Sequence, residues 1–229
     1  MKVSLKKAVI AIIIANSILI AGAVCGWILG RFDYSKHFDD AVIYVDGENI
    51  SLREFGYYIF EVEAFVQKQA LLYDPENPKH WWNTHFSAGM DSQFVCDYAK
   101  KVAINSCIAD EIYYMEAVRN GFALSADEEK RAADQAKDII GSMDLPQMNA
   151  AGLSDEIIAD MCKKQSLASK YAQSLITNED VSAYPGDPYE LVNWDGAYYL
   201  EKVLPGHETW TNDDLLDQIT LGKITVNMQ

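Results

Sequence analysis

The sequence predicts a mainly α-helical protein, in which an N-terminal transmembrane helix precedes a multi-helix domain with a small β element formed by N- and C-terminal strands. Three observations predict this fold class: a long apolar run near the N-terminus, capped amphipathic segments between turn signals, and short β-type stretches at both ends of the remaining chain. We expect a cytoplasmic start and signal-anchor over 1–31, a tether over 32–40, a helical domain over 41–176 and a segment over 177–229 that packs back on it.

The apolar run covers residues 8–30 (AVIAIIIANSILIAGAVCGWILG) and stops at Arg31. As a helix it would be about 34 Å long, enough to cross a bilayer core of roughly 30 Å. Lys2, Lys6 and Lys7 precede it, and lysines on this side favour a cytoplasmic N-terminus. The rest of the chain is therefore predicted to lie outside the cell membrane, as the extracytoplasmic part of a single-pass bacterial protein.

Two processed forms compete with this signal-anchor. The small residues Ala21, Gly22 and Ala23 would suit a signal peptidase that cleaves after Ala23, and Cys25 could carry a lipid. However, the chain stays apolar from Val24 to Leu29, where a cleaved signal normally turns polar. We therefore favour an uncleaved anchor, with cleavage as the first alternative and lipidation as the second.

The charge balance is strongly acidic, with 19 basic and 34 acidic residues. Residues 1–31 hold four of the basic residues and no acid, so the rest of the chain has 15 basic and 34 acidic residues, a net charge of −19. A surface of this sign repels nucleic acid, and it helps to keep an exposed apolar groove soluble. The cysteines have no CxxC spacing, so no disulfide framework is implied.

Helix boundaries are well marked in the central region. Ser51 and Glu54, and later Ser125 and Glu128, stand at the spacing of a capping box, and Asn120-Gly121 is typical of a helix C-terminus. Apolar residues recur at three-and-four spacing between these signals. The expected helices cover about 51–73, 90–120, 125–142 and 154–176, with a break around Pro146 and Gly152.

The β element is expected from segments far apart in the chain. Residues 41–45 (AVIYV) predict a strand that ends at an Asp46-Gly47 turn. Residues 197–204 alternate enough to predict a second strand, and we expect Tyr198–Leu204 to pair with Val42–Val45. A short helix over 211–220 and a last strand over 221–226 complete the predicted elements.

Two stretches carry a resemblance to a known family: residues 45–55 (VDGENISLREF) and residues 116–128 (EAVRNGFALSADE). Their pattern and order resemble the N-terminal peptide-binding domain of SurA- and PrsA-type extracytoplasmic foldases, over about residues 41–176. The resemblance implies a SurA N-like helical fold and binding of unfolded polypeptides. Foldases of this type usually carry a parvulin-type prolyl isomerase domain of roughly a hundred residues, and this chain has only about fifty residues after the helices.

Large aromatic side chains are the candidate binding residues. They provide more apolar surface than four helices need to cover one another, and the neighbours in Tyr57-Tyr58 and Tyr113-Tyr114 cannot both point inward on one helix face. We expect a groove that grips unfolded segments without sequence selectivity. A satellite cluster under the 74–90 loop, or an interface with a second subunit, would also explain them. The candidate peptide-binding residues are Tyr57, Tyr58, Phe65, Trp81, Trp82, Phe86, Tyr113 and Tyr114.

No catalytic, metal or cofactor site is predicted. His80 and His85 have acids nearby, but their spacing matches no ligand pattern, so we interpret them as loop histidines. There is no phosphate-binding glycine loop and no nucleophile with an identifiable base. The sequence thus predicts a membrane-anchored, noncatalytic chaperone that binds exported polypeptides, with homo-oligomers possible. The alternatives are a scaffolding subunit that holds one folded partner in a membrane complex and a foldase related to prolyl isomerases.

Overall fold

A computed structural model describes residues 32–85, 92–177 and 179–228. Phe32 and Asp33 belong to a separate unit with the N-terminal residues, and the fold described below begins at Tyr34. The predicted transmembrane helix over 8–30 lies outside the described residues. Among the residues that are described, no helix combines the length and apolar character that crossing a membrane requires.

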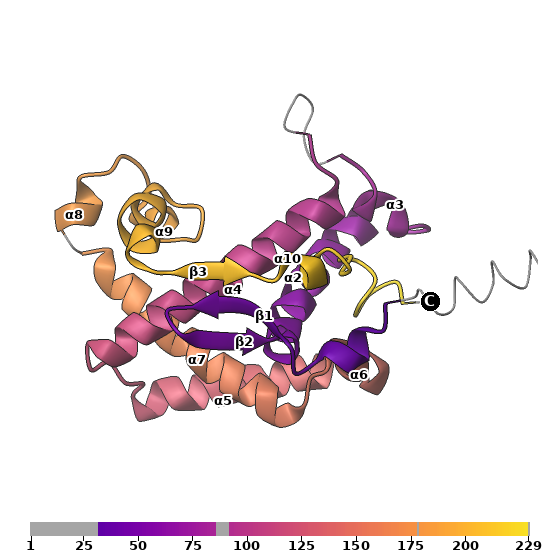
Figure 1. Cartoon of the computed structure of the whole chain (residues 1–229), viewed down its shortest axis with the longest axis horizontal. Helices are drawn as coiled ribbons and strands as arrows, with labels where there is room; N and C mark the ends of the chain where they lie inside the picture. The colour runs from indigo at the N-terminus through magenta and orange to yellow at the C-terminus, as the bar shows by residue number, and fades with distance from the viewer. Residues whose placement is uncertain (1–31, 86–91, 178, 229) are drawn as a thin grey trace, which may run out of the picture. The chain divides into compact units, whose positions relative to one another are not determined.

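Four long helices form most of this fold: α2 (Leu52–Tyr73), α4 (Val95–Arg119), α5 (Ala126–Ser142) and α7 (Asp155–Leu175). Helix α4 packs against both α2 and α7, and α5 covers the other side of α7 (Figure 1). The prediction of a mainly helical protein is confirmed. The shorter helices are α3 (Lys79–Trp82), α6 (Leu145–Ala151), α8 (Glu179–Ser182), α9 (Pro188–Leu191) and α10 (Asp213–Leu216), with 3-10 turns over Tyr34–His37 and Leu204–Gly206.

Local sequence signals fix the helix starts. Ser51 and Glu54 form the predicted capping box at the start of α2, and Ser125 and Glu128 form the second one at the start of α5. In each box the serine hydroxyl accepts from the backbone of the glutamate, whose carboxylate accepts from the serine N–H. Two details of the helix prediction were wrong. Helix α4 begins at Val95 and not at 90, and the predicted break around Pro146 contains α6, which starts from an unexpected Asp144 cap.

A three-stranded antiparallel sheet lies against the helices, in the order β2 (Glu48–Ser51), β1 (Ala41–Val45), β3 (Thr209–Thr211). Figure 1 shows that β3, from the end of the chain, runs beside β1 from its beginning. The small β element from N- and C-terminal strands is thus confirmed. The hairpin strand β2 was not predicted, because its residues overlap the capping signal at Ser51.

The predicted pairing of Tyr198–Leu204 with Val42–Val45 is wrong. Residues Tyr199–Val203 form a π-helix, and Thr209–Thr211 pairs with Ile43–Val45 instead. Both Tyr198 and Tyr199 are buried, which a half-exposed strand with alternating faces would not allow.

Contacts at the Asp46-Gly47 turn set the register of β3. The Asp46 carboxylate accepts from the Glu208 backbone N–H at 2.7 Å and lies 2.7 Å from Nδ1 of His207. The Asp46 N–H in turn donates to the Glu208 carbonyl at 2.9 Å. His207 therefore ties the segment before β3 to the β1–β2 turn, and the strand position follows from these tertiary contacts rather than from local alternation.

The predicted strand over 221–226 is also wrong, because this segment wraps around a buried carboxylate. Glu63, on α2, has no exposed surface. Its Oε1 accepts from the N–H groups of Gly222, Lys223 and Ile224 at 2.5 to 3.2 Å. Its Oε2 accepts from the N–H and hydroxyl of Thr225, both at 2.6 Å, and from the Val226 N–H at 3.2 Å. Donors that converge on one side chain cannot form a strand ladder, so the segment curls over α2.

Candidate functional site

An apolar groove runs between α2 and α4. It has a volume of about 520 Å³. Helix α2 presents Val62, Phe65, Val66 and Gln69 to it at three-and-four spacing, which places them on one face of the helix. Helix α4 closes the other side over Val95–Val102, and Trp81 of α3 also lines it. The lining residues are Glu61, Val62, Phe65, Val66, Gln69, Trp81, Val95, Tyr98, Ala99 and Val102.

The short helix α3 is held so that one tryptophan is buried and its neighbour lines the groove. Trp82 is buried and its indole N–H donates to Gln67 of α2 at 2.9 Å. Trp81, the preceding residue of α3, is partly exposed, and its ring centroid lies 4.9 Å from that of Tyr73. The hydrogen bond of Trp82 therefore helps to hold α3 where Trp81 lines the groove.

Of the aromatic residues proposed from the sequence, two line this groove. Phe65 is 65% exposed and Trp81 is partly exposed. Tyr57, Tyr58, Trp82 and Tyr113 are buried in the core, and Tyr114 is partly buried beside Lys164, whose ammonium lies 5.1 Å from the ring centroid. Phe86 lies outside the described residues.

The adjacent tyrosines on α2 contact two different helices. The Tyr57 hydroxyl lies 3.1 Å from Gln165 of α7, and the Tyr58 hydroxyl donates to Asp110 of α4 at 3.1 Å. Their rings are nearly perpendicular, with centroids 5.6 Å apart. The second surface expected for one member of the pair is thus the interior of the bundle, and these two side chains hold α2 to α7 and α4.

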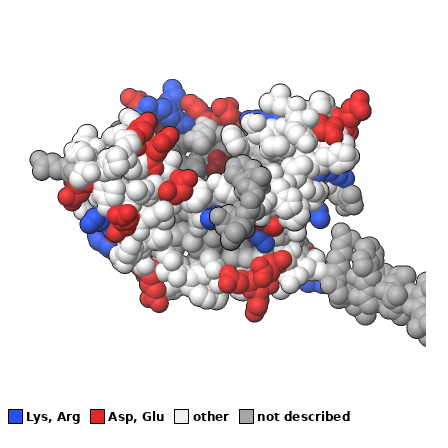
Figure 2. Space-filling model, turned by 90° about the horizontal axis from the view of Figure 1, so that it is seen from above, with Lys and Arg blue, Asp and Glu red and all other residues white. Residues whose placement is uncertain are grey.

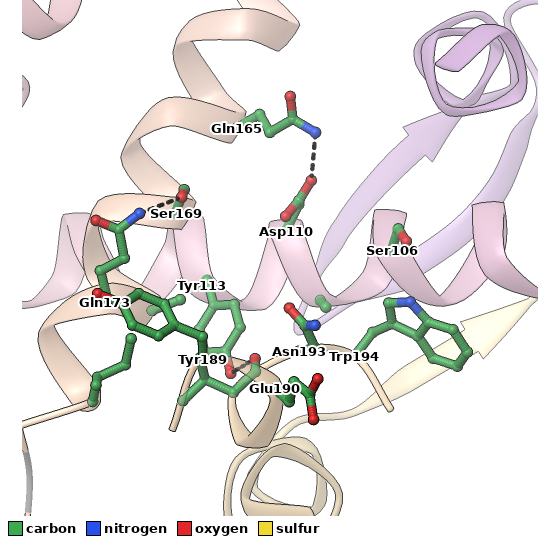
Figure 3. A pocket seen from close by; sticks show the side chains of 14 residues that line it. Ser106, Asp110, Tyr113, Gln165, Ser169, Gln173, Tyr189, Glu190, Asn193 and Trp194 are labelled. Atoms are coloured by element: carbon green, nitrogen blue, oxygen red, sulfur yellow. Dashed lines mark hydrogen bonds between the residues drawn. The ribbon is translucent and has the colours of Figure 1, made fainter. Parts of the chain in front are cut away.

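A polar cleft was missed by the sequence analysis. It has a volume of about 400 Å³ and lies between α4, α7 and the segment that begins with α9 (Figure 3). Gln165, Ser169 and Gln173 stand four residues apart along α7 and give it one polar wall. That i, i+4, i+8 polar stripe was visible in the sequence and could have indicated a surface not covered by apolar packing.

A carboxylate and amide network joins the two cavities. The Gln165 side-chain amide donates to Glu61, which lines the apolar groove, at 3.2 Å, and to Asp110, which lines the polar cleft, at 3.3 Å. Burial raises the pKa of Asp110 to about 7, although the hydrogen bonds from Tyr58 and Gln165 act in the opposite direction. Burial also raises the pKa of Glu61.

The raised pKa of Asp110 gives a prediction for stability. Between the pKa of Asp110 in the unfolded chain and its raised pKa in the folded protein, the folded state holds a proton that the unfolded chain has released. The free energy of unfolding therefore falls as pH rises from about 4 to about 7. At pH 8 the free energy of unfolding of Asp110→Asn should therefore exceed that of the parent by about 2 kcal/mol. Near pH 4 the two proteins should be equally stable. Urea titrations at both pH values measure this, and a difference that does not change with pH would contradict it.

Comparison of the chain with protein-family models, curated proteins and solved structures found no match. The function must therefore be inferred from the site itself.

The described histidines near the groove have local partners. His80 lies 2.9 Å from Asp74 and 2.9 Å from Asn77, and His85 lies 2.5 Å from the Ser92 hydroxyl. Within the described ranges, no group of three or more histidine, cysteine or acidic side chains is arranged to hold a metal ion. The groove is lined mostly by apolar side chains, so the contact that it offers is burial of apolar surface.

Proposed function

We propose that this chain is a membrane-anchored, extracytoplasmic chaperone-like protein that holds unfolded, exported polypeptide segments without catalysis. The observation that carries the proposal is the open apolar groove between α2 and α4, with the exposed Phe65 at its edge. The resemblance of residues 45–55 and 116–128 to SurA- and PrsA-type foldases supports it, as does the apolar run over 8–30.

Exposed apolar side chains continue the groove-lining face of α2 beyond Gln69. Leu72 and Tyr73, three and four residues after Gln69, are 80% and 59% exposed in the last turn of the helix that bears Phe65. Exposed apolar side chains gathered on one helix are typical of an interaction surface. A bound apolar segment would gain roughly 25 cal/mol for each Å² that it buries here, enough for weak and reversible binding.

The surface charge fits this use. The chain has a net charge of −15, and acidic side chains are spread around broad uncharged areas of the face seen in Figure 2. Mutual repulsion of loaded complexes would keep them dispersed while an apolar segment is held. It would also favour client segments with a net positive charge.

The groove residues give the direct test. Phe65→Ala and Trp81→Ala, made together in the full chain in lipid nanodiscs, should reduce suppression of aggregation of an unfolded client by about tenfold or more. The expected loss follows from removing two large aromatic contacts, each of which contributes roughly 1.5–3 kcal/mol when buried. Light scattering at equimolar ratio measures the effect.

Trp210→Ala is the matched control, because Trp210 is 55% exposed on β3 and does not line the groove. Equal losses in the control and the double variant would contradict a specific groove. Photocrosslinking from position 65 distinguishes the chaperone from the main alternative, a scaffolding subunit. A scaffolding subunit would capture one stoichiometric partner, whereas a chaperone would capture a diffuse set of exported proteins. Turnover of a proline-containing test peptide would instead support the isomerase-related alternative.

A further inference from the structure

The polar cleft has three walls that come from distant parts of the chain. Asp110 and Tyr113 project from α4, and Gln165, Ser169 and Gln173 from α7 (Figure 3). The third wall is formed by α9 and the residues after it, which contribute Tyr189, Glu190, Asn193 and Trp194. At about 400 Å³ the cleft lies within the range of about 300–1,000 Å³ that is usual for small-ligand pockets.

The tertiary contacts of Tyr113 give the cleft a fixed shape. Its hydroxyl donates to the Val192 carbonyl at 2.6 Å, which ties the third wall to α4. Val192 and Leu191 are buried in a separate apolar cluster with Val181 and Tyr198. The cleft is therefore a pocket built between packed elements, and its outer edge is formed by Tyr189, which is 64% exposed.

The lining is suited to a positive charge. It contains two carboxylates, Asp110 and Glu190, and none of its lining residues is a lysine or an arginine. The rings of Tyr113, Tyr189 and Trp194 also line it. Carboxylates bind ammonium and guanidinium groups by charge-assisted hydrogen bonds, and aromatic rings attract the same groups through their faces.

Asp110 has little charge compensation from the protein. Its hydrogen-bond donors Tyr58 and Gln165 are both neutral. The cation that acts to lower its pKa, Lys164, forms an ion pair with Glu111. Other titratable or charged groups around it are Glu61 of α2, Tyr113 of α4, Glu128 and Arg131 of α5, Lys170 of α7, Glu190 of α9 and Tyr199 of the π-helix.

Asp110, Gln165, Ser169 and Gln173 also line an adjoining cavity that contains Lys170, but this lysine is engaged elsewhere: its ammonium donates to Glu128 at 2.7 Å and to the Ala123 carbonyl at 2.9 Å. A ligand that brings a cation into the cleft would thus add a positive charge on the side of Asp110 where no lining side chain carries one.

We propose that this cleft binds an organic cation, the guanidinium or ammonium group of an arginine or lysine side chain in a held polypeptide. The polypeptide as the source of the cation rests on the proposed function, whereas binding of the cation itself does not. Asp110 would accept hydrogen bonds from the cation, Glu190 would add a second negative charge, and the three rings would cover its faces. An anionic ligand such as a phosphate ester would be repelled.

Titration of the full chain with N-acetyl-arginine amide, followed by calorimetry, tests the cleft directly. The matched ligand N-acetyl-citrulline amide has nearly the same shape without the charge, and we expect it to bind at least tenfold more weakly. Asp110→Asn should weaken arginine binding at least tenfold, and Glu190→Gln by a smaller factor. Asp138→Asn, an exposed acid of α5 that does not line the cleft, should leave binding unchanged.

A pH series provides a readout that a purely structural role would not change. Because burial raises the pKa of Asp110 to about 7, affinity for the arginine ligand should rise between pH 6 and pH 8, and binding near pH 6.5 should release a proton. Equal binding of the arginine and citrulline ligands, or equal losses in Asp110→Asn and Asp138→Asn, would overturn the proposal.

Binding of a peptide tests whether the cation comes from a held polypeptide, and it tests the cleft and the groove independently. A short apolar peptide with one arginine should lose affinity in both Phe65→Ala and Asp110→Asn, whereas the free arginine ligand should respond only to Asp110→Asn. If the free ligand binds and the peptide binds no better, the cleft is a site for a free organic cation and the link to the held polypeptide is wrong. If Phe65→Ala has no effect on the peptide, the proposed groove fails while the cleft stands.

Discussion

Glu63→Ala should lower the free energy of unfolding by about 4 kcal/mol, the largest effect expected of a single substitution here. Six donors of residues 222–226 converge on the Glu63 carboxylate, and the side chain is fully buried. Alanine would leave these N–H groups without an acceptor, and each unsatisfied buried group destabilises by roughly 1–3 kcal/mol. The segment can recover water as a partner only by leaving α2.

Two measurements check this expectation. Urea unfolding gives the change in stability, and hydrogen exchange should show the amides of residues 222–226 among the most slowly exchanging in the parent and unprotected in the variant. Glu129→Ala, at an exposed position of α5, is the control and should change stability by less than about 0.5 kcal/mol. Protected amides in Glu63→Ala would contradict the role given to this carboxylate.

Release of this segment should also affect the groove. A side chain at Gly222 would come within 2.5 Å of the Trp82 ring, so the backbone of the segment lies directly on that indole. Trp82 in turn positions α3 and with it Trp81, which lines the groove. Client binding in Glu63→Ala should therefore weaken together with the protection of residues 222–226, although neither Glu63 nor that segment lines the groove.

What the sequence could predict was governed by how local each interaction is. The helices α2 and α5 were predicted because Ser51–Glu54 and Ser125–Glu128 cap them within one turn. The strand β3 was not, because its position depends on His207 and Glu208 meeting Asp46 across about 160 residues of chain. A local pattern contains no information about such a partner.

In the candidate site, too, the features set by local sequence were predictable and those set by distant contacts were not. Periodicity placed Val62, Phe65 and Val66 on one face of α2, but it could not say which aromatic neighbours lie in the core. Tyr57 and Tyr58 are both buried because α7 and α4 each supply a polar partner for a hydroxyl. Asp110 likewise looks like an ordinary helix-surface acid in the sequence, and only the packing of α7 and α9 around it creates the polar cleft.

Gly56→Ala should destabilise the protein by about 3 kcal/mol, although alanine is favoured over glycine within a helix by roughly 1 kcal/mol. Gly56 lies in the first half of α2, where α6 crosses it. A Cβ at this position would be 2.1 Å from the carbonyl oxygen of Ala151. That atom belongs to the backbone of α6, so no side-chain rotation can relieve the overlap and the two helices must move apart.

Two contacts at Gly152 resist displacement of α6. Gly152, which ends α6 with a φ of +70°, lies so close to Phe38 that a Cβ there would be 2.7 Å from its ring. The Gly152 carbonyl also accepts from Arg53 of α2 at 3.1 Å. The overlap at Gly56 therefore cannot be relieved by a free movement of α6, which is why we expect a value at the upper end of the range for overpacked positions.

Gly141→Ala is the matched control, because Gly141 lies in the last turn of α5 and a Cβ there would meet no atom within 4 Å. The same chemical change should stabilise the protein at that position by up to about 1 kcal/mol, through helix propensity alone. Thermal unfolding of the two variants beside the parent measures both signs in one experiment. If Gly56→Ala raises the midpoint as Gly141→Ala does, the close contact between α2 and α6 does not exist in solution, and the placement of the groove-bearing helix against α6 is wrong.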